Sequence, residues 1–373
     1  MSSSEIVPKV AKAIAGEAKV RFDLTPADVE PWVKLVEQHG VTELLASNHA
    51  RLEFPRETDH PIRTELRKRS RNAAVREVLQ QSELMELLGA IGEARIDVLL
   101  LKGAALAHTL YPSPHLRPRG DTDLLVGPED LDALHEVLVA SGYEPLPTDG
   151  VPDVQMRERP YLKKGPAGMR HTIDLHWALA NRADLRDRFV FGGLWGRSIP
   201  VPRLGASARA LSRSDALIHA AIHRSAHHDE SDRLIWLYDI HLLLGAMSRE
   251  ERAECFARAR AKEVSAAVKS GVEKTAKLFG TKIGGDELGM LESVATDVTA
   301  RYVRIGRRGF GDLLHELRTQ PAGDRVAFLR GVAFPSPRYM MDKFRTRHAV
   351  LVPWLYFRRG IEGGVKMLRR KRG

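Results

Sequence analysis

The sequence predicts an α+β fold in which a small module of helices and strands lies between two helical segments. Apolar residues recur at helical spacing near both ends of the chain, whereas between about 95 and 180 they gather into short continuous runs typical of buried strands. The 373 residues are enough for two domains or one large one. We expect a helical segment over 1–94, an α/β core over 95–205 and a helical domain with a basic tail over 206–373.

The outer segments carry the helical signal. Residues 26–50 are predicted to be helical with a break near Gly40, and residues 63–95 form a long helix that is basic early and apolar later. From about 207 onward nearly the whole chain is predicted to be helical.

The central module alternates strands and helices. Its predicted elements, in order, are a strand over 96–101, a helix over 103–111, a loop rich in Pro, Gly and Arg over 112–120, a strand over 122–126, a helix over 128–143 and a hairpin over 154–179. In the second helix, Pro128 suits a first-turn position and Gly142 suits the end. The chemistry of the protein is therefore to be sought in this module.

Composition limits the partners and the compartment. Lys and Arg number 58 against 48 Asp and Glu, and this formal charge of +10 favours anionic partners such as nucleotides, nucleic acid or a membrane surface. Cys255 is the only cysteine, which excludes an internal disulfide and a cysteine-based zinc site. We expect a cytoplasmic protein with no signal peptide and no transmembrane segment, because no apolar run is long enough for either.

Two aspartates stand at the start of the strand predicted over 122–126. Residues two apart point to the same side of a strand, so Asp121 and Asp123 project together and repel each other unless a cation lies between them. Mg²⁺ prefers oxygen ligands and commonly bridges carboxylates to substrate phosphates. Asp174, with His176 two residues later, begins a similar apolar strand and is the candidate third carboxylate. The alternative interpretation is a solvated acid at a strand edge.

A phosphate-binding turn is the second part of the predicted site. Lys102 and Gly103 follow the strand predicted over 96–101 and precede a helix. A glycine at such a turn lets a phosphate approach the backbone N–H groups at the helix N-terminus. Lys102 and Arg117 are expected to neutralise further phosphate charge.

Three histidines recur every four residues in the C-terminal helical segment. His219, His223 and His227 therefore line one helix face, but they span about 12 Å and cannot all reach one metal ion. The alternatives are a metal site built from one pair, a role for His223 or His227 facing substrate or phosphate, and partly buried structural histidines.

A second helix face combines Arg233, Trp236 and Asp239. Trp236 is predicted to belong to the core. Asp239 stands in an apolar run, and an unpaired buried carboxylate is costly. We therefore expect Asp239 to pair with an arginine or histidine, or to face the site.

Several separated motifs occur in one order along the chain. They are Lys102-Gly103, then Tyr111, then an arginine before the D-x-D-L-L-V segment that ends at Val126, then "IDLHW" over 173–177, then a histidine-bearing helix and "RLIWLYD" over 233–239, and more weakly "FPSPRYM" over 334–340. In these motifs the chain resembles the uncharacterised nucleotidyltransferase group of the DNA polymerase β-like superfamily. The resemblance covers about residues 95–245.

The resemblance implies a small mixed β-sheet nucleotidyltransferase core flanked by helices. It implies transfer of a nucleoside monophosphate from an NTP donor to an acceptor, with release of pyrophosphate. Asp121 and Asp123 would then be ligands of Mg²⁺ (or Mn²⁺), and Asp174 the third acid, which also helps to deprotonate the acceptor. The residues assigned to nucleotide binding are Lys102, Gly103, Arg117, His176, His227, Arg233 and Asp239.

One departure from the superfamily pattern keeps other functions open. The superfamily usually places Gly-Ser or Gly-Gly at the phosphate turn, and here Gly103-Ala104 lacks the hydroxyl. A related phosphotransfer at the same carboxylates, or a non-catalytic module that binds RNA or protein, are the alternatives. The acceptor is a small molecule, a peptide or protein, or RNA. The basic tail predicts weak contact with nucleic acid or a membrane surface.

Overall fold

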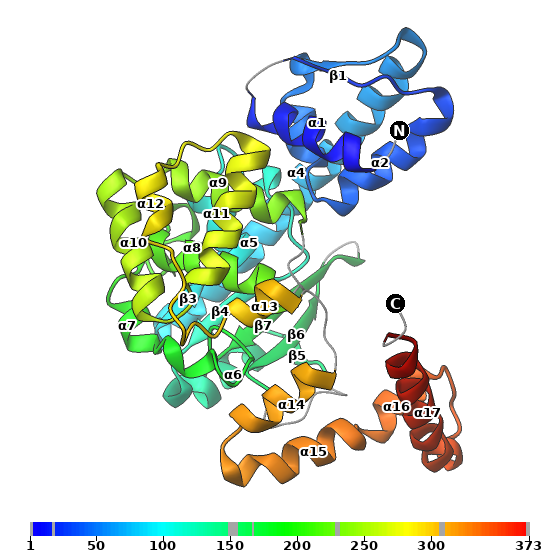
Figure 1. The fold of residues 1–373 in the computed structure, drawn as a ribbon, viewed down its shortest axis with the longest axis vertical. Helices are drawn as coiled ribbons and strands as arrows, with labels where there is room; N and C mark the ends of the chain where they lie inside the picture. Colours follow the sequence, from blue (N-terminus) through cyan, green and yellow to red (C-terminus); the bar gives the residue numbers. More distant parts are fainter. Residues whose placement is uncertain are drawn as a thin grey trace.

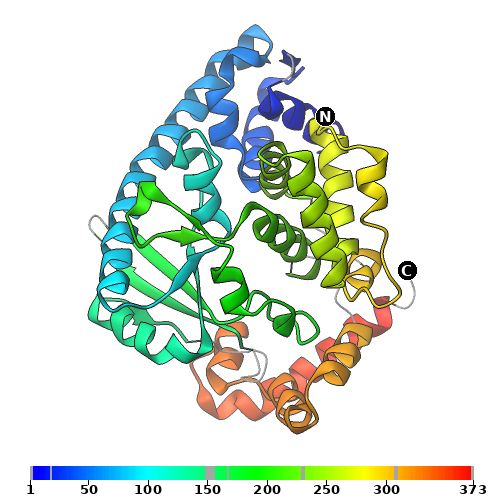
Figure 2. The same ribbon diagram turned by 90° about the vertical axis from the view of Figure 1, so that its left-hand side faces the viewer.

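A computed structural model of the chain has a mixed β-sheet near its centre and helices on both sides of it (Figure 1). The model describes residues 3–16, 19–147, 156–165, 168–227, 232–305 and 310–370. The α+β class predicted from the sequence is confirmed. The N-terminal helices gather at one end of the molecule, and the C-terminal helices extend from the other (Figures 1 and 2).

The helices follow one another along the whole chain. They are α1 (Ser3–Ala15), α2 (Val29–Gln38), α3 (Thr42–Ser47), α4 (Arg56–Glu93), α5 (Lys102–Thr109), α6 (Leu131–Ala140), α7 (Phe191–Trp195), α8 (Arg213–Ile222) with a π-helical turn (His223–His227), α9 (Leu234–Gly245), α10 (Arg249–Ala261), α11 (Ser265–Phe279), α12 (Gly285–Gly289), α13 (Ala300–Ile305), α14 (Phe310–Thr319), α15 (Arg325–Ala333), α16 (Pro337–Lys343) and α17 (Val352–Arg370). The strands are β1 (Val20–Arg21), β2 (Leu52–Glu53), β3 (Val98–Leu100), β4 (Thr122–Val126), β5 (Glu144–Pro145), β6 (Glu158–Lys164), β7 (Arg170–His176), β8 (Ile199–Pro200) and β9 (Arg209–Ala210).

Most predicted elements of the central module are confirmed. The strands predicted over 96–101 and 122–126 are β3 and β4, and the predicted hairpin is the antiparallel pair β6–β7. Residues 154–155 and 166–167 of that hairpin lie outside the described residues. The break near Gly40 separates α2 from α3, and this glycine has a φ of 68° that favours glycine.

Two expectations about the flanking segments were wrong. The long helix begins at Arg56 rather than at 63, and the N-terminal segment contains the short parallel pair β1–β2. The described region after 207 is nearly all helical, as expected, apart from the two-residue strand β9. A two-residue strand shows no alternation of apolar and polar residues. It forms because a backbone edge is available for pairing, which the sequence does not reveal.

Strand order places the two acid-bearing strands side by side. In the part of the chain that the structure describes, the sheet has seven strands in the order β5-β6-β7-β4-β3-β9-β8. β4 and β7 are parallel neighbours, and their register pairs Asp123 with Asp174. Strands 51 residues apart in the sequence thus bring two carboxylates to one place.

Both faces of the sheet are buried, but against different helices. Leu99 and Leu125 belong to a core shared with the N-terminal helices and α8–α11, whereas Leu100, Leu124 and Ile173 pack with α4 and α6. Burial on both sides explains why these strands are apolar throughout rather than alternating. Because side chains alternate along a strand, Asp121 and Asp123 project on the same side as Leu125, towards α8 and α9.

Helix α4 connects the N-terminal helices to the sheet. Its first half contributes Ile62 and Leu66 to the core of the N-terminal helices, and its second half contributes Leu84 and Ile91 to the core under the sheet. Figure 2 shows it running along one edge of the molecule between these two parts. Helix α4 therefore contributes side chains to the hydrophobic cores of both parts.

The C-terminal helices leave the body of the molecule. α14 and α15 lead away from the sheet, and α16 and α17 pack on each other at the far end (Figure 1). Within the described part of the chain, no helix has the length and apolarity needed to cross a lipid bilayer.

Candidate active site

A single large cavity collects the residues that the sequence singled out. It has a volume of about 1090 Å³ and opens between the sheet, α4, α8 and α9. The predicted site residues that line it are Lys102, Gly103, Arg117, Asp121, Asp123, Asp174, His176, His227, Arg233 and Asp239. The fold thus brings together all of the residues assigned from the sequence, although no ligand is present to test their individual roles.

Asp123 is the buried centre of the site. Lys102 Nζ donates to its Oδ1 at 2.6 Å, and His176 Nε2 lies 2.9 Å from the same oxygen. Burial alone would raise the pKa of Asp123, but Lys102 and His176 together hold that pKa well below its usual range. His176 Nδ1 lies 3.3 Å from Glu158, so the imidazole is held between two carboxylates. Asp123 is therefore an ionised acceptor at neutral pH.

The pKa values of the two remaining aspartates are raised rather than lowered. Partial burial, together with the charges of Asp121 and Asp123, raises the pKa of Asp174 to about 6. Partial removal from water and the neighbouring Asp123 also raise the pKa of Asp121. Three carboxylates thus share one corner of the cavity with a single ammonium, that of Lys102. Partial burial and the like charges beside them therefore disfavour the ionised forms of Asp121 and Asp174.

Lys102 occupies the turn between β3 and α5 in an unusual conformation. Its φ is 46°, a left-handed value that costs free energy for a residue other than glycine. The Leu101 N–H donates to the Asp123 carbonyl at 3.0 Å, which fixes the turn to β4. A Cβ on Gly103 would lie 3.4 Å from the Arg119 Cβ, an ordinary contact, so packing alone does not require glycine here. A close approach of a phosphate to the backbone remains a prediction.

Arg117 and Asp239 form a buried ion pair. Arg117 Nε and Nη2 donate to the two Asp239 oxygens at 2.9 and 2.8 Å, and the Tyr111 hydroxyl donates to Oδ1 at 2.7 Å. The expectation that Asp239 pairs with an arginine is confirmed. This two-point contact joins the loop before β4 to α9. Its geometry favours positioning of the loop over direct contact with a ligand.

A second buried network, which the sequence did not indicate, lies behind the same loop. Arg119 Nη1 donates to both oxygens of Glu77 at 2.8 and 2.7 Å, and His108 Nε2 lies 3.2 Å from Glu77 Oε1. Glu77 lies on α4, so the loop that carries Asp121 is bonded to α4 as well as to α9. Nothing in the sequence signals this contact, because Glu77 is one of several acids on α4.

A row of rings forms another wall of the cavity. The ring centroids of His219 and His223 lie 6.2 Å apart, and those of His223 and His227 lie 5.7 Å apart and stack. Trp236 meets His223 edge-on at 5.5 Å, and the Arg233 guanidinium lies 5.3 Å from the Trp236 ring centroid. The prediction that Trp236 is a core residue was wrong in part, because its ring is partly exposed and lines the cavity.

The buried end of this row lies near the carboxylates. Burial, together with the charge of Lys102, lowers the pKa of His219 to about 3, so its imidazole is neutral. The π-helical turn at His223–His227 widens the helix where the row leaves the core. Such turns are frequent at functional sites.

Helix α4 of the N-terminal segment forms a further wall of the cavity. Lys68, Arg69, Asn72 and Arg76 of α4 line the cavity, and Arg69 forms an ion pair with Glu37 at 2.6 Å. The early part of this helix is basic in the sequence, but nothing in its pattern indicates that the basic side faces a cavity. Only the path of α4 past the sheet decides it.

The donor set suits a hard divalent cation. Carboxylate oxygens are the ligands that Mg²⁺ and Mn²⁺ prefer, and a cation would relieve the repulsion that, after burial, helps to raise the pKa of Asp174. Among the residues that the structure describes, however, no three His, Cys, Asp or Glu side chains are gathered closely enough to form a ready-made metal site. Binding therefore requires the side chains of Asp121, Asp123 and Asp174 to adjust.

A comparison with known families decides the relationship of this chain. The model of the uncharacterised nucleotidyltransferase family matches residues 25–280. The chain belongs to the uncharacterised nucleotidyltransferase family. The match confirms the resemblance and extends it beyond 95–245 at both ends, so the N-terminal helices that wall the cavity are part of the family's pattern.

Two other comparisons add little. No curated protein matches the chain. Among solved structures, an antigenic nucleotidyltransferase-like protein from Paracoccidioides brasiliensis is similar, with 14% sequence identity and a TM-score of 0.35. The alignment covers 61% of this chain and 96% of that one.

Removing Asp239 should destabilise the protein strongly. In Asp239→Ala, Arg117 is left buried without its partner, and we expect the free energy of unfolding to fall by about 3–5 kcal/mol. Urea denaturation followed by circular dichroism measures this loss. The matched control is Asp286→Ala, which removes an exposed ion pair with Arg249 and should cost less than about 1 kcal/mol. Equal losses in the two variants would contradict a structural role for the buried pair.

Replacing Asp174 should instead stabilise the protein in metal-free buffer. Its carboxyl binds a proton more tightly in the folded state, so its ionisation lowers stability above pH 6, and this cost disappears below about pH 4. We expect Asp174→Asn to be more stable than the parent protein by about 1–2 kcal/mol at pH 7.5. Urea denaturation at pH 7.5 and pH 4 tests this, and a gain that is the same at both pH values would refute the assigned cause.

Proposed function

We propose that the protein is a Mg²⁺-dependent nucleotidyltransferase that moves a nucleoside monophosphate from an NTP to an acceptor. The observation that carries the proposal is the meeting of Asp121, Asp123 and Asp174 from two parallel strands at one end of a large cavity. Burial and the repulsion between these carboxylates raise the pKa of Asp174, and a bound cation would relieve that repulsion and in turn attract phosphates. Membership of the family supports the same class of reaction.

The reaction joins an acceptor oxygen to the α-phosphorus of the NTP and breaks the bond between that phosphorus and the oxygen bridging to the β-phosphate. The leaving group is pyrophosphate, and the acceptor loses a proton. Asp174 is the group proposed to take this proton, because a pKa of about 6 keeps it ionised and basic at neutral pH. Bound Mg²⁺, held by Asp121, Asp123 and Asp174, would supply charge stabilisation at the phosphates.

Five of the other residues predicted at the site divide into two groups. Lys102, the backbone at Gly103 and His176 lie beside the carboxylates and are proposed to contact the phosphates. Arg117 and Asp239 bond to each other and are proposed to position the loop that carries Asp121.

The ring wall is the proposed binding surface for the base of the nucleotide. His223, His227 and Trp236 present partly exposed rings to the cavity, and Arg233 lies against Trp236. Planar rings stack on bases of any sequence with about 1–3 kcal/mol per base. This wall begins at His219, whose pKa responds to Lys102, so it starts beside the phosphate end of the site.

Calorimetry with each of the four NTPs, with and without Mg²⁺, tests the proposal. We expect Mg²⁺-dependent binding that is lost in Asp121→Ala/Asp123→Ala, because the variant lacks two cation ligands. Asp97→Ala/Asp130→Ala, which lies outside the cavity, is the matched control and should bind as the parent protein does.

Each result of this titration has a distinct meaning. Binding of one NTP by the parent protein alone would name the donor and allow a screen for the acceptor. Failure of the well-folded parent protein to bind any NTP would refute the proposal and favour a non-catalytic binding module. Mg²⁺-independent binding that survives in the variant would point to a different phosphotransfer.

Removing the Trp236 ring separates base binding from phosphate binding. We expect Trp236→Ala to weaken NTP binding by about tenfold, because stacking is lost, while inorganic tripolyphosphate binds as tightly as before. Trp195→Ala, at a ring outside the cavity that stacks with Phe191, is the control and should leave both affinities unchanged. Equal weakening of both ligands in Trp236→Ala would show that the ring supports the fold rather than the base.

A further inference from the structure

The positive charge of this protein is concentrated at its C-terminal end. Residues 325–373 contain 13 Lys and Arg and only two acidic residues, Asp342 and Glu362. This excess is larger than the net charge of +10 of the whole chain, so the residues before 325 are together close to neutral. The charge therefore belongs to a segment that contributes nothing to the lining of the active-site cavity.

One side of α17 packs inward. Val352 and Leu355 are buried, as is Met340 of α16, against which α17 packs. The Tyr356 hydroxyl donates to the Pro335 carbonyl, and Arg359 Nη1 donates to the Val332 carbonyl at 2.7 Å. These contacts fix which face of α17 is turned away from α16.

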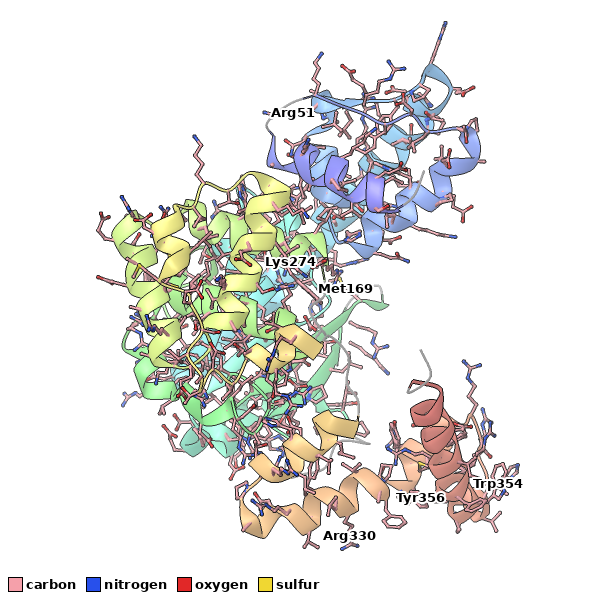
Figure 3. The ribbon with its side chains drawn as sticks, viewed as in Figure 1. Arg51, Met169, Lys274, Arg330, Trp354 and Tyr356 are labelled. Carbon is pink, nitrogen blue, oxygen red and sulfur yellow. The ribbon has the colours of Figure 1, made fainter. Side chains whose placement is uncertain are left out.

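The opposite side of α17 is apolar and exposed. Val350, just before the helix, is 84% exposed, Trp354 is 54%, Phe357 is 68% and Ile361 is 52% exposed. Their spacing of four, three and four residues places them on one stripe, on the other side of the helix from Val352 and Leu355. Figure 3 shows Trp354 on the outer side of the α16–α17 unit. We call these four residues the apolar stripe.

Basic side chains surround the apolar stripe. Arg338, Lys343, Arg345 and Arg347 are exposed on α16 and on the turn that follows it. The Arg358 guanidinium lies over the rings of Phe344 and Trp354, at 4.9 and 5.6 Å from their centroids. An exposed apolar stripe with a cationic rim is the arrangement found in helices that lie in the interface of a bilayer.

We propose that α17 and the turn before it bind the surface of an anionic lipid bilayer, with the apolar stripe below the headgroups and the basic rim at their level. The aliphatic members of the stripe, Val350 and Ile361, favour lipid over nucleic acid, because phosphates and bases would leave them in water. A second copy of the chain is disfavoured by the repulsion between two strongly positive segments. Tryptophan is enriched at the bilayer interface, which suits Trp354.

The helix would lie along the membrane rather than cross it. No helix of the described chain is long and apolar enough to span a bilayer. Because the cavity lies on the sheet and not on α14–α17, this surface is independent of the proposed nucleotidyl transfer. The protein would be held at the membrane with its active site in water.

Sedimentation of the full-length protein with vesicles tests the proposal. One set of vesicles is phosphatidylcholine alone, and the other has two parts phosphatidylcholine to one part phosphatidylglycerol. We expect binding to the second set only, and loss of that binding as salt rises from about 0.1 M to about 1 M, where screening shortens the range of the charges about threefold. Equal binding to both sets, or binding to neither, would overturn the proposal.

Two variants separate the apolar and the electrostatic parts. Trp354→Ala/Phe357→Ala should lower partitioning into anionic vesicles by about tenfold or more. Arg345→Glu/Arg347→Glu should also lower it, and should weaken its dependence on salt. The control Val78→Ala/Val190→Ala removes equally exposed apolar side chains elsewhere, and it should bind as the parent protein does.

The remaining outcomes also decide between partners. Circular dichroism spectra that match the parent protein establish that each variant is folded. Vesicle binding that is unchanged in Trp354→Ala/Phe357→Ala would refute insertion of the stripe. Tight binding of a single-stranded RNA oligonucleotide that displaces the vesicles and does not depend on Trp354 and Phe357 would assign the basic surface to nucleic acid instead. Loss of NTP binding has no bearing on this test, since the readout is lipid alone.

Discussion

The site depends on carboxylates that two neighbouring parallel strands hold close together at one end of a large cavity. β4 and β7 are parallel neighbours, and their register sets Asp123 opposite Asp174 while Asp121 stands at the strand entrance. The backbone pairing of β4 and β7 keeps these carboxylates close together, with Asp123 buried, Asp174 half-buried and Asp121 exposed. Lys102 and His176 contact Asp123 directly. Like charges held this close favour the binding of a cation, which would in turn attract phosphates.

The loop that delivers the carboxylates is held from both sides. Arg117 bonds it to α9 through Asp239, and Arg119 bonds it to α4 through Glu77. Both pairs are buried. Arg117 makes two parallel hydrogen bonds to Asp239, which fixes direction as well as distance, whereas Arg119 donates to both Glu77 oxygens from Nη1 alone. Buried ion pairs contribute little net stability but strongly penalise any arrangement that separates them. Here they specify where Asp121 and Asp123 lie relative to the helical walls of the cavity.

Charge is distributed along the chain according to position in the fold. The cavity combines an acidic corner, a row of rings and a basic wall on α4, whereas the net positive charge of the protein resides in residues 325–373. The helices of that segment leave the body of the molecule (Figure 1) and carry the exposed apolar stripe. The two features are separate in sequence and in space.

The sequence by itself determined the local elements and the chemical types at the site. The aspartates beside apolar runs, the Lys102-Gly103 turn and the acid in the run around Asp239 were all visible, because each breaks a local pattern. The expectation that Asp174 begins its strand was wrong, since β7 starts at Arg170 and pairing with β6 extends it. Tertiary structure alone decided that Trp236 lines the cavity, that α4 turns Lys68 and Arg76 towards it, and that Glu77 holds Arg119. It also decided the pairing of two-residue strands such as β9. These features depend on which surfaces meet after folding, and contacts between residues far apart in the chain leave no periodic signal in the sequence.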